Sequence, residues 1–110
     1  MATNQDVVWD ALGDRTRRSI VLHLSDGPMA VGELATFLPV SRSAVSQHLK
    51  VLKDAGLVAE DVAGTRHIYR LNEAGVVALR DQLDTFWNRA LRGYQELVQP
   101  HERGSHEPHP

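Results

Sequence analysis

The sequence predicts a mainly α-helical domain with one small β-hairpin, and three observations lead to this class. Apolar residues recur at helical spacing through most of the chain up to residue 98. Residues 58–71 are instead rich in β-branched residues on either side of a glycine turn. The chain has 110 residues, 42% of them hydrophobic, which suits one domain with a single core. We therefore expect a domain over residues 1–98 and, because residues 99–110 lack periodicity, a disordered polar tail.

Composition and motifs argue against several classes of protein. The chain has no cysteine, so no disulfide framework, thiolate metal site or cysteine nucleophile is expected. It has no apolar run of the roughly 20 residues that a membrane span needs. No secretory signal is visible at the N-terminus, and we expect a cytoplasmic protein with no membrane partner. There is no nucleophile–base pairing, glycine-rich phosphate loop or HExxH motif, so we expect neither enzymatic activity nor a cofactor.

The first part of the chain predicts three short helices. They are expected over residues 5–12, 15 to about 25, and 31–38. Asp14 is placed to cap the second of these helices. Three arginines crowd the first turn of that helix, at positions 15, 17 and 18. Because cations are unfavourable at a helix N-terminus, we expect either a solvated end paired with nearby aspartates or contact with a phosphate backbone.

The fourth helix has the most informative surface. Ser41 is placed as its N-cap, and Gly56 suits the left-handed residue that ends a helix. Val45, Leu49 and Leu52 recur at helical spacing and should face a core. The opposite face has donors and acceptors but no carboxylate before residue 54; it consists of Arg42, Ser43, Ser46, Gln47 and Lys50. A helix with such a face fits the DNA major groove, although a solvated polar face is the alternative.

Side-chain chemistry suggests how this face would divide its work on DNA. Gln47 can contact adenine through its bidentate amide, and Arg42 can reach guanine or a phosphate. Ser43 and Ser46 are short donors that can reach either bases or the backbone. We therefore expect Ser43, Ser46 and Gln47 to read bases.

Positive charge is modestly concentrated around this helix although the whole chain carries a net charge of −2. Residues 41–70 contain five basic and three acidic residues. Lys50 and Lys53 suit phosphate contacts, which set affinity and salt dependence. His48 lies at the border of the polar face, where phosphate contact and simple packing are both open. The net negative charge nevertheless argues weakly against nucleic-acid binding.

Residues 58–62 and 66–71 are expected to form the two strands of the hairpin. The third and fourth helices are separated by a short connection, which is the helix-turn-helix arrangement. A hairpin that follows this arrangement is a wing. Its tip would place Thr65, Arg66 and His67 along a phosphate backbone or in the minor groove.

The last helix, expected from Glu73 to about Val98, has the strongest periodicity in the chain. At about 1.5 Å per residue it would run to roughly 39 Å, longer than a domain of this size can cover. We therefore expect its apolar stripe and the first helix to meet a second copy of the chain, with packing on its own core as the alternative. The expected interface residues are Val8, Trp9, Leu12, Leu83, Trp87, Ala90, Tyr94 and Leu97.

The tail contains His101, His106 and His109, which could in principle bind a transition metal. Nothing in the sequence would hold these ligands in place. We therefore expect a flexible polar end and no metal site, with a metal sensor built on the tail as an alternative.

Taken together, these motifs resemble the ArsR family of dimeric winged helix-turn-helix transcriptional regulators. The resemblance is carried by residues 11–20, 31–35, 40–52 and 55–58, and by Gly64 with residues 69–71. It implies five helices plus a two-stranded wing, a homodimer through the first and last helices, and binding to a partly palindromic DNA operator, usually as a repressor. A protein-interaction dimer with a vestigial DNA face is the rival interpretation.

The resemblance does not extend to the family's metal sites. Metal-sensing members carry cysteines in the helix before the recognition helix, where this chain has Ala35, Thr36 and Phe37. Other members place metal ligands on the last helix, where this chain has Asp84 but no histidine before His101. The resemblance therefore implies a subgroup without these sites, and the small-molecule effector stays unknown.

Overall fold

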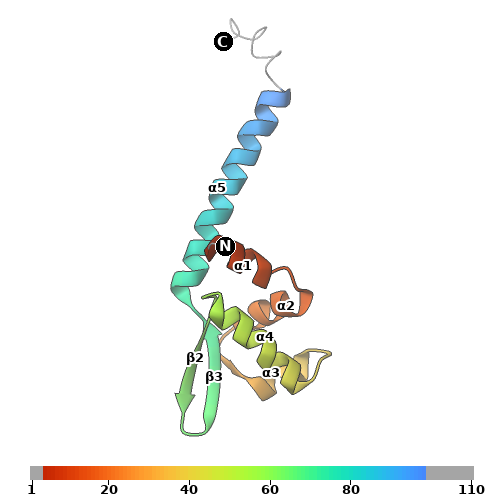
Figure 1. Cartoon of the computed structure of the whole chain (residues 1–110), viewed down its shortest axis with the longest axis vertical. Helices are drawn as coiled ribbons and strands as arrows, with labels where there is room; N and C mark the ends of the chain where they lie inside the picture. Colours follow the sequence, from red (N-terminus) through yellow and green to blue (C-terminus); the bar gives the residue numbers. More distant parts are fainter. Residues whose placement is uncertain (1–3, 99–110) are drawn as a thin grey trace, which may run out of the picture. The chain divides into compact units, whose positions relative to one another are not determined.

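The computed structural model describes residues 4–98, with side chains described from residue 7 onward. The elements in chain order are α1 (Asn4–Ala11), α2 (Arg15–Leu24), β1 (Met29–Ala30), α3 (Val31–Phe37), α4 (Arg42–Asp54), β2 (Val58–Ala63), β3 (Arg66–Leu71) and α5 (Glu73–Val98) (Figure 1). All five predicted helices and both hairpin strands are therefore confirmed. The expected tail over residues 99–110, with its three histidines, lies outside the described residues.

The sheet has one strand more than the sequence predicted. Strand β3 lies in the middle, in the order β1-β3-β2, and both pairings are antiparallel. The hairpin pairs from Val58 with Leu71 to Ala63 with Arg66, and β1 pairs Met29 with Tyr69. A strand of two residues is too short to show an alternating pattern, which is why the expected wing had only two strands. The wing hairpin, β2 and β3, is thus part of a three-stranded sheet.

One hydrophobic core joins α1, α2, α3, α4 and the start of β2. Its buried residues are Val8, Ala11, Ile20, Leu24, Leu34, Leu38, Val45, Leu49, Leu52, Leu57 and Val58. The apolar stripe of α4 consists of Val45, Leu49 and Leu52, which are all 0% exposed. This stripe fixes the helix to the body of the fold. Because a buried aliphatic side chain contributes about 1.5–3 kcal/mol, the stripe is a strong anchor.

Val8 corrects one expectation about the dimer surface. Its side chain is 8% exposed and packs in the core of its own chain, whereas the neighbouring Trp9 is 44% exposed. Val8 and Ala11 lie three positions apart and share the inward face of α1. Of Val8 and Trp9, only Trp9 offers substantial surface to a partner.

The arginines at the start of α2 bond to the end of α1. Arg17 Nε donates to the carbonyl of Ala11 at 2.6 Å, and Arg18 Nη1 donates to the carbonyl of Leu12 at 2.7 Å. The last carbonyls of a helix have no partner within the helix, so these two guanidinium groups close the C-terminus of α1. Asp14 caps α2 as predicted, accepting from the Arg17 amide at 3.0 Å. A purely solvated helix end therefore does not describe Arg17 and Arg18, whereas contact with a phosphate backbone stays a prediction.

The start of α5 is anchored on the end of α4. Asn72 donates from its side-chain amide to the carbonyl of Gly56 at 2.9 Å. A Cβ atom added to Gly75 would lie only 1.9 Å from that carbonyl oxygen, so glycine is required for this approach. Gly56 has φ +83°, the left-handed conformation predicted for it.

Further along α5 the apolar side chains are exposed. The boundary between two compact units falls between Leu79 and Arg80, within this helix. Beyond that boundary the exposed large apolar residues are Leu83, Phe86, Trp87, Leu91, Tyr94, Leu97 and Val98. No residue of α5 is buried. Among the described helices, none combines the length and apolar character needed to cross a membrane.

Candidate nucleic-acid interface

Helix α4 presents one buried and one exposed face, as the sequence predicted. Ser41 begins it, its hydroxyl accepting from the Ala44 amide at 3.1 Å. Its connection to α3 consists only of residues 38–41. The polar residues predicted to face DNA are all exposed: Arg42, Ser43, Ser46, Gln47 and Lys50. The helix is therefore held from one side and open on the other.

A groove separates the start of α3, the exposed face of α4 and the wing. Its volume is about 670 Å³, and its lining includes Gly32, Arg42, Ser46, Thr65, Arg66 and His67. The Arg42 guanidinium folds back over α3, with Cζ 3.5 Å from the position a Cβ on Gly32 would occupy. Two of the predicted α4 residues, Arg42 and Ser46, thus share one surface with the predicted residues of the wing tip.

Glu33 lies at the edge of this groove. Its Oε1 accepts from the Ala30 amide at 2.9 Å and lies 3.8 Å from Nη2 of Arg66. The first contact replaces a side-chain N-cap, which Ala30 cannot supply. The second is a loose and exposed pair, so it restrains the Arg66 guanidinium only weakly.

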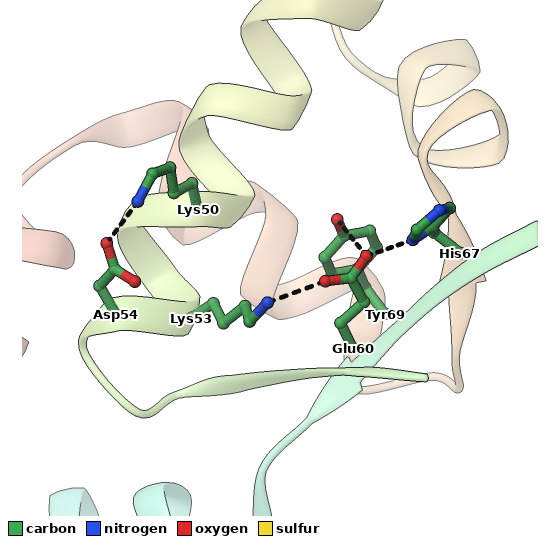
Figure 2. A network of polar contacts seen from close by, with 6 residues as sticks. All are labelled: Lys50, Lys53, Asp54, Glu60, His67 and Tyr69. Carbon is green, nitrogen blue, oxygen red and sulfur yellow. Dashed lines mark hydrogen bonds and ion pairs between the residues drawn. The ribbon is translucent and has the colours of Figure 1, made fainter. Parts of the chain in front are cut away.

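A second carboxylate, Glu60 on β2, lies where α4 meets the wing (Figure 2). Its Oε1 accepts from Lys53 Nζ at 2.9 Å, and its Oε2 accepts from the Tyr69 hydroxyl at 3.2 Å and contacts His67 Nδ1. These donors hold the pKa of Glu60 at about 2, with the Lys53 bond as the largest cause and the His67 bond next. The same contact raises the pKa of Lys53, while burial and then the Glu60 bond raise the pKa of Tyr69.

The two lysines of α4 are held differently. Lys50 pairs with Asp54 one turn further along the helix, at 3.1 Å, and both side chains are largely exposed, at 76% and 63%. Exposed pairs of this kind contribute little, so a phosphate can displace Asp54 easily. Lys53 pairs with a carboxylate that is only 17% exposed and that has two further donors. The predicted phosphate role is therefore open to Lys50 and opposed at Lys53.

His48 lies on the side of α4 that faces α2. It is half-buried, and its Nδ1 is 3.3 Å from Nη1 of Arg17. Arg17 in turn donates to the last carbonyls of α1. Of the two roles left open by the sequence, packing within the fold is the one this geometry favours.

The remaining predicted interface residues lie on or near α1 and α5. Trp87 is 61% exposed, Tyr94 64% and Leu97 84%, and Leu83 and Ala90 are also exposed. Leu12 is half-buried against the core. Among the described residues, no group of three or more His, Cys, Asp or Glu side chains is placed to hold a metal ion.

Comparison with known proteins identifies the family of this chain. Residues 12–61 match the family described as "Helix-turn-helix domain". The HTH-type transcriptional regulator Rv2034 of Mycobacterium tuberculosis is 61% identical over 93 residues, covering 84% of this chain and 87% of the relative. The transcriptional repressor SdpR of Bacillus subtilis is 31% identical, covering 82% of this chain and 97% of the relative.

A solved structure supports the same assignment. It is the homodimeric winged helix-turn-helix DNA-binding domain Mb0332 of Mycobacterium bovis, described as a possible ArsR-family regulator. It is 29% identical, covers 82% of this chain and 83% of its own, and superimposes with a TM-score of 0.65. This chain belongs to the ArsR family of winged helix-turn-helix transcriptional regulators. It is a DNA-binding transcriptional regulator.

Sequence reasoning missed the carboxylates at this surface. Glu60 was counted only as one of the three acidic residues of the 41–70 segment, although the hairpin register places it opposite Tyr69. A register assumed from the glycine turn would have predicted this pairing. The contact with Lys53 depends on how α4 packs against the wing, and no local pattern in the sequence reports that packing.

Proposed function

We propose that this regulator acts as a homodimeric repressor of transcription on a partly palindromic operator. The observation that carries this proposal is the exposed polar face of α4, whose opposite stripe is fully buried. A helix fixed in this way can enter a major groove without rearranging the core. Two copies would place their recognition helices in successive major grooves about 34 Å apart. The named repressor among its relatives supports the direction of regulation.

The exposed stripe of α5 supports the dimer. It contains two aromatic side chains that are more than 60% exposed, Trp87 and Tyr94, and aromatic residues are enriched in buried interfaces. A homodimeric neighbour with the same fold agrees with this arrangement. We propose that residues 1–98 carry both DNA binding and dimerisation. The dimer would form through Trp9, Leu12 and the exposed α5 residues.

Within the DNA surface we assign three kinds of contact. Ser43, Ser46 and Gln47 read bases, and Arg42 reaches a base or a phosphate once it leaves α3. The backbone contacts come from the N-terminus of α4, from Lys50 and from the wing, through Ser41, Lys50, Thr65, Arg66 and His67. We propose that the protein is cytoplasmic and that this surface has no catalytic role.

The test is binding of the purified protein to the DNA upstream of its own gene, followed by fluorescence anisotropy against salt. Gln47→Ala should reduce discrimination at one base position by about 1–3 kcal/mol, because the bidentate amide is lost. Lys50→Gln should weaken binding to all DNA sequences alike. It should also reduce the slope of log affinity against log salt by about one. Unchanged affinity and specificity in Gln47→Ala would show that the reading face has been assigned wrongly.

One observation favours a second candidate, a winged-helix dimer that binds a protein and has lost its DNA function. The net charge is −2, and carboxylates partner three of the cations at this surface: Lys50, Lys53 and Arg66. The same titration separates the two candidates. Absence of any salt-sensitive, sequence-selective binding would favour the protein-interaction role.

A further inference from the structure

Glu60 is a negative charge held in the middle of a surface that must approach a polyanion. Its side chain is 17% exposed and has contacts on both oxygens, from α4 and from β3 (Figure 2). Among the described residues, every hydrogen-bond partner of the Glu60 carboxylate is a side chain, and none is a backbone amide. A carboxylate in this position repels a nearby phosphate. Its presence on a proposed DNA-binding surface therefore needs an explanation.

We infer that Glu60 withholds Lys53 from the DNA phosphates and thereby sets operator affinity below the limit that the cations of this surface would allow. The inference rests on the proposed DNA-binding role of α4 and the wing. It assigns Glu60 as a positioning residue, since it acts on DNA through Lys53.

The charges of the contact support this role. Lys53 and Glu60 are 2.9 Å apart, so together they present no net charge to a phosphate. A phosphate that recruits Lys53 must break this bond and leave Glu60 close to its own negative charge. Each lysine that neutralises a phosphate releases counterions and adds about 0.9 to the slope of log affinity against log salt. A withheld lysine contributes none of this.

The neighbouring pair shows why Glu60 can withhold a lysine while Asp54 cannot. Asp54 lies on the same helix as Lys50, has an exposed side chain and makes one contact. Glu60 lies on a different element from Lys53 and is also bonded to Tyr69 and His67. Because these contacts fix the carboxylate, Lys53 loses its partner entirely when it turns toward DNA.

The decisive variant is Glu60→Gln, which keeps the shape and an accepting oxygen but removes the charge. Operator binding should tighten, and the salt slope should steepen by about 0.9. The advantage over the wild type should therefore shrink by about 3.5-fold between 50 and 200 mM salt. The double variant Lys53→Gln/Glu60→Gln should return to the wild-type slope, because the released cation is gone.

Asp61→Asn is the matched control. It removes the same charge one residue further along β2, where Asp61 pairs with Arg70 at 2.8 Å, and neighbouring strand residues point to opposite faces. Asp61→Asn should leave the slope unchanged. Equal steepening in both single variants, an unchanged slope in Glu60→Gln, or a double variant that stays steep would overturn the inference.

Failure of the inference and failure of the proposed function give different results. If the wild-type protein binds no operator, the proposed function fails before any variant is compared. If the wild-type protein binds and Glu60→Gln merely weakens binding in parallel with a loss of thermal stability, Glu60 is a structural clamp and the inference fails alone.

Discussion

Helices α4 and α5 have similar amphipathic patterns but different surroundings. In α4 the apolar stripe of Val45, Leu49 and Leu52 is completely buried by the same chain. In α5 the stripe is exposed, and Trp87 and Leu97 are 61% and 84% accessible. The polar face of α4 is its proposed DNA-binding surface, whereas in α5 the apolar face is the surface left to explain.

The difference shows that periodicity tells where a stripe lies and not what covers it. The two helices are bounded correctly by the same rules of spacing and capping. What separates them is the supply of partner surface, because α1, α2 and α3 cover α4 within the core. An exposed apolar surface of this kind marks an interaction site, and the proposed partner is a second copy of the chain.

The largest expected effect comes from a substitution in the buried stripe of α4. Leu49→Ala should lower the free energy of unfolding by about 2–5 kcal/mol, because Leu49 is 0% exposed and its removal leaves a cavity. Leu83→Ala makes the same chemical change on α5, where the side chain is 43% exposed. It should lower the free energy of unfolding by an amount that depends on protein concentration, as expected for a residue at a dimer interface.

Urea unfolding followed by circular dichroism at two protein concentrations, tenfold apart, would measure both variants. The Leu49→Ala loss should be similar at the two concentrations. A Leu83→Ala loss as large as that of Leu49→Ala, and independent of concentration, would mean that the chain itself covers the α5 stripe.

The next effect tests the partner directly. Trp87→Ala should weaken dimerisation by about 2 kcal/mol, roughly 30-fold in the dissociation constant, if this side chain is a central anchor of the interface. Tyr94→Ala should act in the same direction. Sedimentation equilibrium would show a shift toward the monomer, and operator binding should weaken in parallel because two half-sites need two copies.

Leu22→Ala is a suitable control for these aromatic variants, since Leu22 is 69% exposed on α2, outside the proposed interface. It should leave the dimer intact. A dimer that survives both aromatic substitutions would move the interface to another surface.

The same comparison explains how much the sequence could predict. Local signals were sufficient for every helix, because caps such as Ser41 and stops such as Gly56 act over only a few residues. They failed for β1, which forms only by pairing Met29 with Tyr69, a residue 40 positions away. A strand of two residues has no pattern of its own.

The candidate site was predictable to a similar degree. The exposed face of α4 followed from its periodicity, since each polar residue lies opposite the buried stripe. The partners of those residues did not follow. Arg42 lying over Gly32 and Lys53 bonded to Glu60 are tertiary contacts, and Arg17 reaching Ala11 was hidden behind an unfavourable charge pattern.

The smallest expected effect compares an ion pair at α4 with one on α5. Glu60 has its pKa lowered to about 2 from an ordinary value of 4.5, so its contacts stabilise the fold fully above about pH 4.5. This stabilisation is lost as the pH falls from there through about 2, because the folded state must then take up a proton that the unfolded state already holds. Glu60→Gln removes the group, so its free energy of unfolding should differ from the wild type most above pH 5 and converge near pH 2.

Asp81→Asn on α5 provides the contrast for this pH series. Asp81 and Arg80 are 3.5 Å apart and both about two-thirds exposed, and an exposed pair of this kind contributes little. Urea midpoints measured from pH 6 to pH 2.5 should therefore converge for wild type and Glu60→Gln while Asp81→Asn follows the wild type throughout. Curves for Glu60→Gln and wild type that run parallel down to the lowest pH would show that the Lys53–Glu60 contact does not stabilise the fold, and a clamp that weak could not withhold Lys53 from a phosphate.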